Sequence, residues 1–128
     1  MTARDALAQA VTEMQAIPYK IEVKDEWNHL QEMLARRGDD CDGHAAGCIE
    51  RVWTLADEPK PGLRYMLGMV GDTGHAWVGM VLPDGEELWA DPTPGYHAHP
   101  EPPGYWTGRT LHAWAPYDGR IWTSLEEV

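Results

Sequence analysis

The sequence predicts an α+β fold in which N-terminal helices pack on an antiparallel β-sheet. Apolar residues recur at helical spacing in the first part of the chain, as far as Leu55. From Leu63 onward the pattern changes to short apolar runs separated by turn sequences such as PDG and YDG. Helices followed by consecutive hairpins are typical of the α+β class. The 128 residues contain no repeat and no linker, so we expect a single domain over residues 1–128.

Two helices are expected before residue 40. Thr2 followed by Asp5 resembles a capping box, and the helix that it starts must end before Pro18, which cannot continue it. Asp25 can cap a second helix, which Gly38 would end. The apolar face of this second helix would carry Trp27, Leu30 and Leu34.

A third helix is expected to begin at Cys41. Its apolar face is defined by residues at spacings of three and four, namely Ala45, Cys48, Val52 and Leu55. Cys41 and Cys48 would lie about 10 Å apart along this helix, beyond the roughly 7 Å between Cα atoms that a disulfide can bridge. Both cysteines are therefore predicted to be free thiols. The position of Cys48 on the apolar face predicts a core residue rather than a reactive one.

The remaining chain predicts two hairpins. LRYMLGMV and GHAWVGMVL are the first strands, and a PDG turn joins the second of them to EELWADPT. A loop rich in proline, glycine and histidine follows over 92–105. LHAWAP and RIWTSL then flank a DG turn as the second hairpin.

The composition excludes several classes of partner. The formal net charge is −11, with only ten lysines and arginines, which disfavours nucleic acids and anionic membranes because these are bound through cationic side chains. No apolar run approaches the roughly 20 residues of a membrane span, and the N-terminus does not resemble a signal peptide. We therefore expect a cytoplasmic protein with a basic or neutral partner, and the sequence leaves the oligomeric state open.

The stretch RRGDDCDGHAAGC, residues 36–48, places Cys41 at a helix start between two aspartates. A thiol reacts as its thiolate, which the positive end of a helix dipole and a nearby imidazolium stabilise. Asp40 and Asp42 oppose this effect, because neighbouring negative charge disfavours the thiolate. Cys41 is therefore a candidate nucleophile whose two acidic neighbours need a separate explanation.

His75 and Asp91 are the candidate partners of Cys41, and the hairpin turn decides whether they can meet. A three-residue loop over 83–85 would place His75 opposite Thr93, with Asp91 as its diagonal neighbour on the same face. A two-residue loop would instead pair Asp91 with Val78 and turn it to the wrong face. A His75–Asp91 pair thus requires the three-residue loop or a compensating bulge.

The segment GHAWVGMVLPDGEELWADPTPG resembles the transglutaminase-like superfamily, in which a strand beginning G-H-A-W-V is followed by a strand ending in D-P-T. RGDDCDGHA is similar to the helix start that carries the nucleophile in that superfamily. Trp27 and the APYDGRIW segment are similar to features of the bacterial transglutaminase-like cysteine peptidases. The resemblance covers residues 25–123 and implies a papain-like, transglutaminase-like core.

The resemblance implies acyl transfer through a catalytic triad. Cys41 would attack an amide carbonyl, His75 would carry the proton to the leaving amine, and Asp91 would orient His75. The Cys41 backbone N–H and a side-chain donor from Trp27 or Gln31 would hold the oxyanion. Hydrolysis of a peptide or isopeptide amide is the leading expectation. Transamidation through the same triad, or a catalytically silent binding module of the same fold, are the alternatives.

No cofactor is required by this chemistry, although calcium would fit the two aspartates. The resemblance implies an acidic cluster around the nucleophile, of which Asp40 and Asp42 are kept and Gly43 replaces the third acid. A bound cation would cancel the charges that oppose the thiolate. A zinc site is the alternative interpretation of this region. Its ligands would be Cys41 and His44, together with His97 and His99 from the later loop. We interpret His44 instead as a neighbour of the nucleophile on the helix surface.

Overall fold

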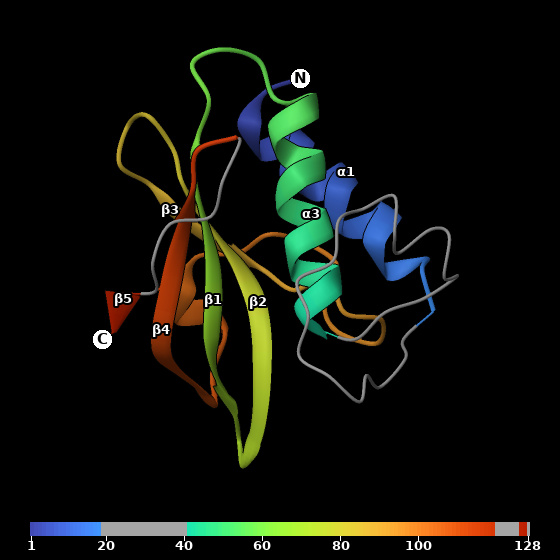
Figure 1. The fold of residues 1–128 in the computed structure, drawn as a ribbon, viewed down its shortest axis with the longest axis vertical. Helices are drawn as coiled ribbons and strands as arrows, with labels where there is room; N and C mark the ends of the chain where they lie inside the picture. The colour runs from blue at the N-terminus through green and yellow to red at the C-terminus, as the bar shows by residue number, and fades with distance from the viewer. Residues whose placement is uncertain (19–40, 120–125, 128) are drawn as a thin grey trace.

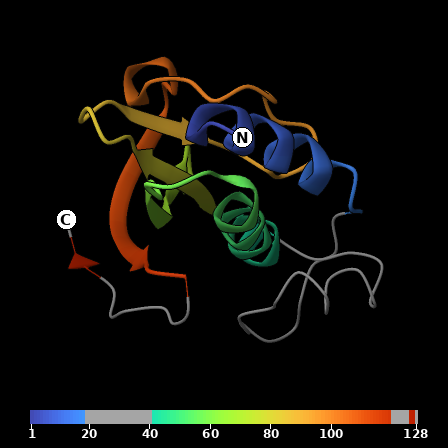
Figure 2. The same cartoon turned by 90° about the horizontal axis from the view of Figure 1, so that it is seen from above.

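The computed structural model describes residues 1–18, 41–119 and 126–127 (Figure 1). Helices α1 (Ala3–Gln15) and α3 (Cys41–Leu55) lie side by side on one side of an antiparallel sheet (Figures 1 and 2). The sheet has the order β3-β2-β1-β4-β5. Its strands are β1 (Gly62–Val70), β2 (Thr73–Val81), β3 (Glu87–Ala90), β4 (Arg109–Tyr117) and β5 (Glu126–Glu127). The predicted α+β fold is confirmed.

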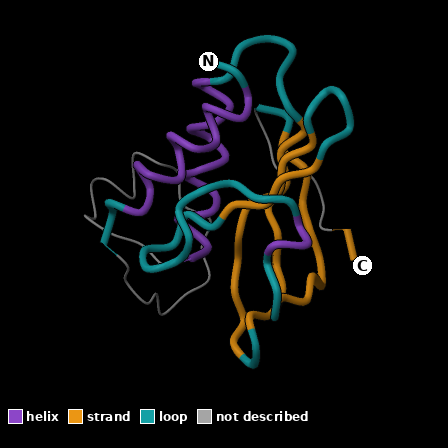
Figure 3. Tube along the Cα trace, turned by 180° about the vertical axis from the view of Figure 1, so that it is seen from behind, coloured by secondary structure: helices purple, strands orange, loops and turns teal. Residues whose placement is uncertain are grey.

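Two predicted elements lie outside the described residues. These are the helix between Asp25 and Gly38 and the strand RIWTSL, although the two residues of β5 that follow it do pair with β4. Between β3 and β4 the chain forms a long loop that includes the short 3-10 helix η1 (Pro103–Tyr105), which crosses over the sheet in Figure 3. None of the helices in the described ranges is both long enough and apolar enough to cross a membrane.

Helix α1 begins as the sequence predicts and is fixed to α3. The Thr2 hydroxyl accepts a hydrogen bond from the Asp5 backbone N–H at 3.1 Å, which satisfies one of the free donors of the first turn. Glu13 forms a bidentate ion pair with Arg51 of α3, with contacts of 2.7 and 3.1 Å. Between the two helices and the sheet lies the apolar core, which includes Leu7, Val11, Ile49, Val52, Tyr65, Val78 and Leu88.

The two faces of β2 have different surroundings. Ala76, Val78 and Met80 belong to the core that the helices cover. Side chains alternate along a strand, so His75 and Trp77 point to the other face of the sheet, which we call the second face. Trp77 is nevertheless fully buried there.

The hairpin between β2 and β3 has the register that a His75–Asp91 pair requires. Val81 pairs with Glu87, and the three-residue loop 83–85 closes with a hydrogen bond from the Leu82 N–H to the Glu86 carbonyl at 2.8 Å. Gly85 has a φ of +92°, as expected for the last position of such a loop. Strand β3 ends at Ala90, before the predicted end at Thr93, because Pro92 has no N–H to donate to the sheet. Continuing the register places Thr93 opposite His75.

Candidate active site

His75 and Asp91 form a buried hydrogen-bonded pair. The Nε2 atom of His75 lies 2.7 Å from Asp91 Oδ2. Asp91 is fully buried and His75 is 8 % exposed. The prediction that the hairpin brings these two residues together is therefore confirmed.

A backbone donor and a cation complete the surroundings of the Asp91 carboxylate. The Thr93 backbone N–H donates to Oδ1 at 3.0 Å, and the Arg109 Nη2 atom lies 2.8 Å from Oδ2. The Thr93 contact is an Asx turn, which explains the D-P-T sequence: Pro92 ends the strand and the aspartate bonds to the backbone two residues later. Burial raises the pKa of Asp91, but the hydrogen bond and charge of His75, the Thr93 N–H and the charge of Arg109 outweigh it. The pKa of Asp91 is lowered as a result.

This arrangement determines which nitrogen of His75 can take part in chemistry. An ionised carboxylate only accepts hydrogen bonds, so the His75 Nε2 must carry the proton that is donated to Asp91. The other ring nitrogen, Nδ1, is then the one that can exchange a proton with a thiol or a substrate. A histidine held in one tautomer by a buried carboxylate is the usual form of a general base.

Aromatic rings enclose the pair. The Tyr96 ring lies 4.8 Å from the His75 ring, and Trp77 stacks beside it at 6.4 Å with an interplanar angle of 20°. Tyr96 is 37 % exposed, so the site is reached by solvent on this side. The rings limit the orientations that the imidazole can adopt.

Gln15, at the end of α1, holds the loop that carries Asp91. Its side-chain amide donates to the backbone carbonyls of Asp91 and Tyr96, each at 3.0 Å, and to that of Thr93 at 3.4 Å. One side chain thereby ties the N-terminal helix to the turn on which the carboxylate sits. This helix therefore contributes to the geometry of the site.

Cys41 is the first residue of α3, as the sequence predicts. Its side chain and that of Asp42 lie outside the described part of the structure, as do Asp40, Trp27 and Gln31 entirely. The distance from the Cys41 sulfur to His75, the predicted calcium ligands and the predicted oxyanion donors therefore stay predictions.

The prediction for Cys48 is confirmed, and that for His44 is wrong. Cys48 is fully buried and free, and burial, with the charges of Asp91 and Glu13, raises the pKa of its thiol. His44 is also fully buried rather than on the helix surface, and its Nε2 lies 2.8 Å from the Ile17 carbonyl. The reason is that α1 packs against α3, so the chain leaving α1 covers the first turn of α3.

The zinc alternative receives no support from the described residues. His97 and His99 are ring neighbours, with centroids 5.5 Å apart, but His44 is occupied with the Ile17 carbonyl. Within residues 1–18, 41–119 and 126–127, no three histidine, cysteine or acidic side chains are grouped to hold a metal ion.

Sequence reasoning missed three residues that shape the site: Gln15, Thr93 and Arg109. The role of Thr93 could have been predicted from the sequence Asp-Pro-Thr. An aspartate side chain often accepts a hydrogen bond from the backbone N–H two residues later, which forms an Asx turn. For Arg109 the sequence offers only an indirect indication. A fully buried carboxylate that has one histidine partner still needs a cation to compensate its charge, but this does not say which cation. Nothing in the local sequence around Gln15 indicates its contact with a loop that follows 76 residues later.

Comparisons with known proteins bear on the fold. No protein-family model matches the chain, and no curated protein matches it by sequence. Solved structures of Legionella pneumophila LapG are similar to it. The calcium-bound form has a TM-score of 0.73 at 14 % identity, covering 86 % of this chain and 63 % of LapG. An EGTA-treated form has a TM-score of 0.75 at 12 % identity, covering 94 % and 71 %. A further LapG structure has a TM-score of 0.72 at 14 % identity, covering 86 % and 62 %.

The fold is transglutaminase-like. The similarity to the LapG structures extends over most of this chain and supports a transglutaminase-like core. The chain spans slightly less than two thirds of the calcium-bound LapG chain. The fold class that the sequence predicts is therefore confirmed at the level of architecture.

Proposed function

We propose that this chain is a cysteine hydrolase that cleaves a peptide or isopeptide amide through a thioester intermediate, with Cys41, His75 and Asp91 as its triad. The buried His75–Asp91 pair carries the proposal. A carboxylate that fixes the Nε2–H tautomer leaves Nδ1 to accept a proton from a thiol. The start of α3 at Cys41 supports the proposal further, because a thiolate is stabilised at a helix N-terminus.

The proposed reaction proceeds in two steps. His75 Nδ1 takes the Cys41 thiol proton, the thiolate attacks the amide carbonyl, and the C–N bond breaks as the leaving amine receives that proton. Water, activated by the same nitrogen, then attacks the thioester, which releases the carboxylic acid and restores the thiol. The Cys41 backbone N–H, with Trp27 or Gln31, would donate to the oxyanion in both steps.

We also propose that a calcium ion binds beside the nucleophile. Carboxylate oxygens are the ligands that calcium prefers, and Asp40 and Asp42 supply two carboxylates. Gly43 supplies no side-chain oxygen, so backbone carbonyls or water would have to complete the coordination. The calcium-bound form of LapG is consistent with this role in the fold. When bound, the cation would offset the negative charge around Cys41.

Thermal unfolding tests the calcium proposal. The midpoint is expected to be higher with calcium than with EGTA, and this difference is expected to disappear in the double variant Asp40→Asn, Asp42→Asn. A double variant that keeps the full calcium-dependent increase would contradict the proposed ligands.

A peptide library tests the hydrolase proposal. The chain, incubated with peptides in water that also contains a labelled primary amine, is expected to yield shortened peptides with free carboxylates. The Cys41→Ala variant is expected to yield none, and Cys48→Ala, whose thiol is buried, serves as the matched control. Incorporation of the amine without hydrolysis would indicate transamidation instead. Equal cleavage by wild type and Cys41→Ala would refute the proposal.

A further inference from the structure

We propose that Arg109 is a positioning residue for the His75–Asp91 pair, holding the carboxylate so that Oδ2 faces the imidazole. The inference rests on the proposed function for its catalytic consequence, and on three independent features for its geometry. These features are a bulge in β4, an aromatic enclosure of the guanidinium and a shared oxygen of Asp91.

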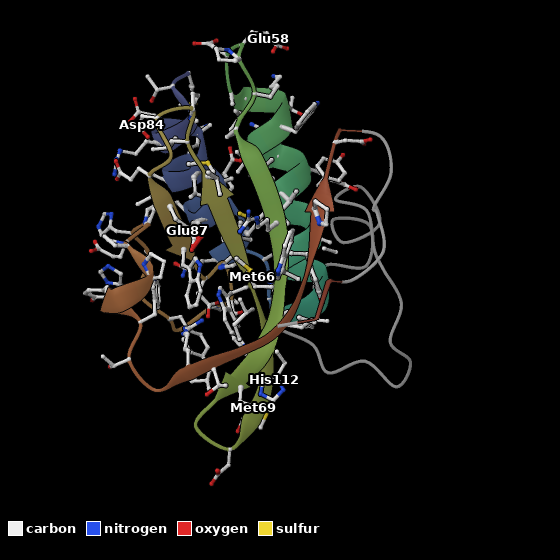
Figure 4. All side chains as sticks on the ribbon, turned by 90° about the vertical axis from the view of Figure 1, so that its left-hand side faces the viewer. Glu58, Met66, Met69, Asp84, Glu87 and His112 are labelled. Atoms are coloured by element: carbon white, nitrogen blue, oxygen red, sulfur yellow. The ribbon has the colours of Figure 1, made fainter. Side chains whose placement is uncertain are left out.

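A one-residue bulge turns Arg109 toward the site. Leu67 of β1 pairs with Ala113 of β4, but the next residue, Gly68, pairs with Leu111, so His112 has no partner in the ladder. Side chains alternate along a strand, so this extra residue reverses the faces on which the preceding β4 residues lie. Figure 4 labels His112 close to Met69, where β4 crosses β1.

The effect of the bulge can be read from the pairing. Ala115 has an odd number and belongs to the core under the helices. Without the bulge, Arg109 would lie on that same side. With the bulge it pairs with Val70 and points instead to the second face, where Trp77 and His75 lie.

The bulge depends on a glycine. A Cβ atom on Gly68 would lie 2.0 Å from the Thr110 carbonyl oxygen and 2.8 Å from the Trp77 ring. Any side chain at this position would therefore force the backbone of β4 to move away from β1. The backbone is shaped at this point to bring Arg109 beside Trp77.

Three aromatic rings enclose the guanidinium. Its Cζ lies 4.5 Å from the Trp106 ring centroid, 5.1 Å from that of Trp77 and 5.4 Å from that of Tyr96. The Arg109 side chain is only 4 % exposed. Planar stacking holds a guanidinium in one orientation, which a flexible ammonium would not share.

The guanidinium and the imidazole contact the same oxygen of Asp91, the guanidinium as an ion pair and the imidazole through a hydrogen bond. Oδ2 lies 2.8 Å from Arg109 Nη2 and 2.7 Å from His75 Nε2, while Oδ1 accepts from the Thr93 N–H. A carboxylate held by donors on both oxygens cannot rotate about χ2 without losing one of them. Arg109 thus fixes the carboxylate oxygen that selects the His75 tautomer. It does so from β4, which is separated from the strand of His75 by β1.

The tautomer of His75 distinguishes positioning from general structural support. Nitrogen-15 NMR of the full chain, with histidine labelled, reports whether Nε2 or Nδ1 carries the proton. Wild type is expected to show the Nε2–H form. Arg109→Met, which removes the guanidinium, is expected to show a mixture of both forms, and Arg109→Lys is expected to recover part of the Nε2–H signal by restoring the cation.

Arg64→Met is the matched control. Arg64 also stacks on a tryptophan, with its Cζ 4.3 Å from the Trp114 ring, and it also faces a carboxylate, with Nη1 3.7 Å from Glu87. It contacts neither His75 nor Asp91, so this variant is expected to keep the wild-type tautomer. In peptide hydrolysis, Arg109→Met is expected to lower kcat by about 10- to 100-fold, with a smaller change in KM, because misplacement of the base affects the chemical step.

The outcomes separate the two proposals. An unchanged His75 tautomer in folded Arg109→Met, or the same mixture in Arg64→Met, overturns the positioning role. A mixture confined to Arg109→Met supports it. Wild type that hydrolyses no peptide overturns the proposed function, and the tautomer measurement then still decides whether Arg109 positions the pair.

Discussion

Replacement of Asp91 by alanine tests how the buried charges at the site compensate one another. The carboxylate accepts hydrogen bonds from His75 and Thr93 and forms an ion pair with Arg109. The Arg109 guanidinium remains buried and charged after the substitution, because its side chain is only 4 % exposed. The variant therefore leaves a buried cation without its anionic partner.

The expected cost follows from this burial. Removal of one partner of a buried ion pair destabilises a protein by about 3 to 5 kcal/mol, mainly because the other charge stays desolvated. Addition of Arg109→Met to Asp91→Ala is expected to recover part of this loss, because the orphaned charge is then gone as well. The two substitutions are therefore expected to be far from additive, with a coupling of about 1 to 3 kcal/mol.

Urea denaturation at neutral pH measures these free energies of unfolding. Asp84→Ala is the control, since the exposed Asp84 also accepts a backbone hydrogen bond, from Glu86 at 2.9 Å, but faces no buried cation. This control is expected to cost no more than about 1 kcal/mol. An Asp91→Ala variant as stable as the control, or additive effects in the double variant, would refute the compensation argument.

Three further predictions concern the same region. The free energy of unfolding is expected to fall as the pH drops through the lowered pKa of Asp91 in the folded protein. The stability that the Asp91 carboxylate contributes is complete above its unfolded pKa of about 3.9. In Asp91→Asn, urea titration at acidic pH should therefore no longer show the share of the pH-dependent loss that comes from Asp91. Gln15→Leu is expected to cost about 1 to 2 kcal/mol and to speed amide hydrogen exchange over 93–96, and unchanged exchange would argue against its anchoring role. Gly68→Ala is expected to cost about 1 to 3 kcal/mol because its Cβ meets the Thr110 carbonyl, and an unaltered urea midpoint would contradict this reading of the bulge.

The parts of the site that are local in sequence could be predicted. The length of the 83–85 loop sets the register of β2 and β3, and the register places His75 and Asp91 as diagonal neighbours. Helix α1 was likewise predictable from Thr2 and Pro18, because caps and breakers act within a few residues.

The parts that depend on tertiary packing could not be predicted. His44 occupies a helix position whose exposure is decided by the chain leaving α1, and no pattern within α3 indicates that cover. Arg109 reaches the site only because β4 contains a bulge at His112, and a bulge of this kind has no signature in the alternation of LHAWAP. Sequence reasoning thus located the pair but missed what holds it in place.

Alkylation of Cys41 by iodoacetamide is the most direct test of the proposed triad, because it requires no substrate. Intact-mass kinetics at mildly acidic pH are expected to show one fast-reacting thiol in wild type and in Cys48→Ala, and none in Cys41→Ala. The fast reaction is expected to slow at least about 10-fold in His75→Ala, because a thiolate stabilised by an imidazolium persists below the ordinary thiol pKa of about 8.5. If Cys41 reacts at the same rate with and without His75, the two residues do not form a catalytic pair and the account is wrong.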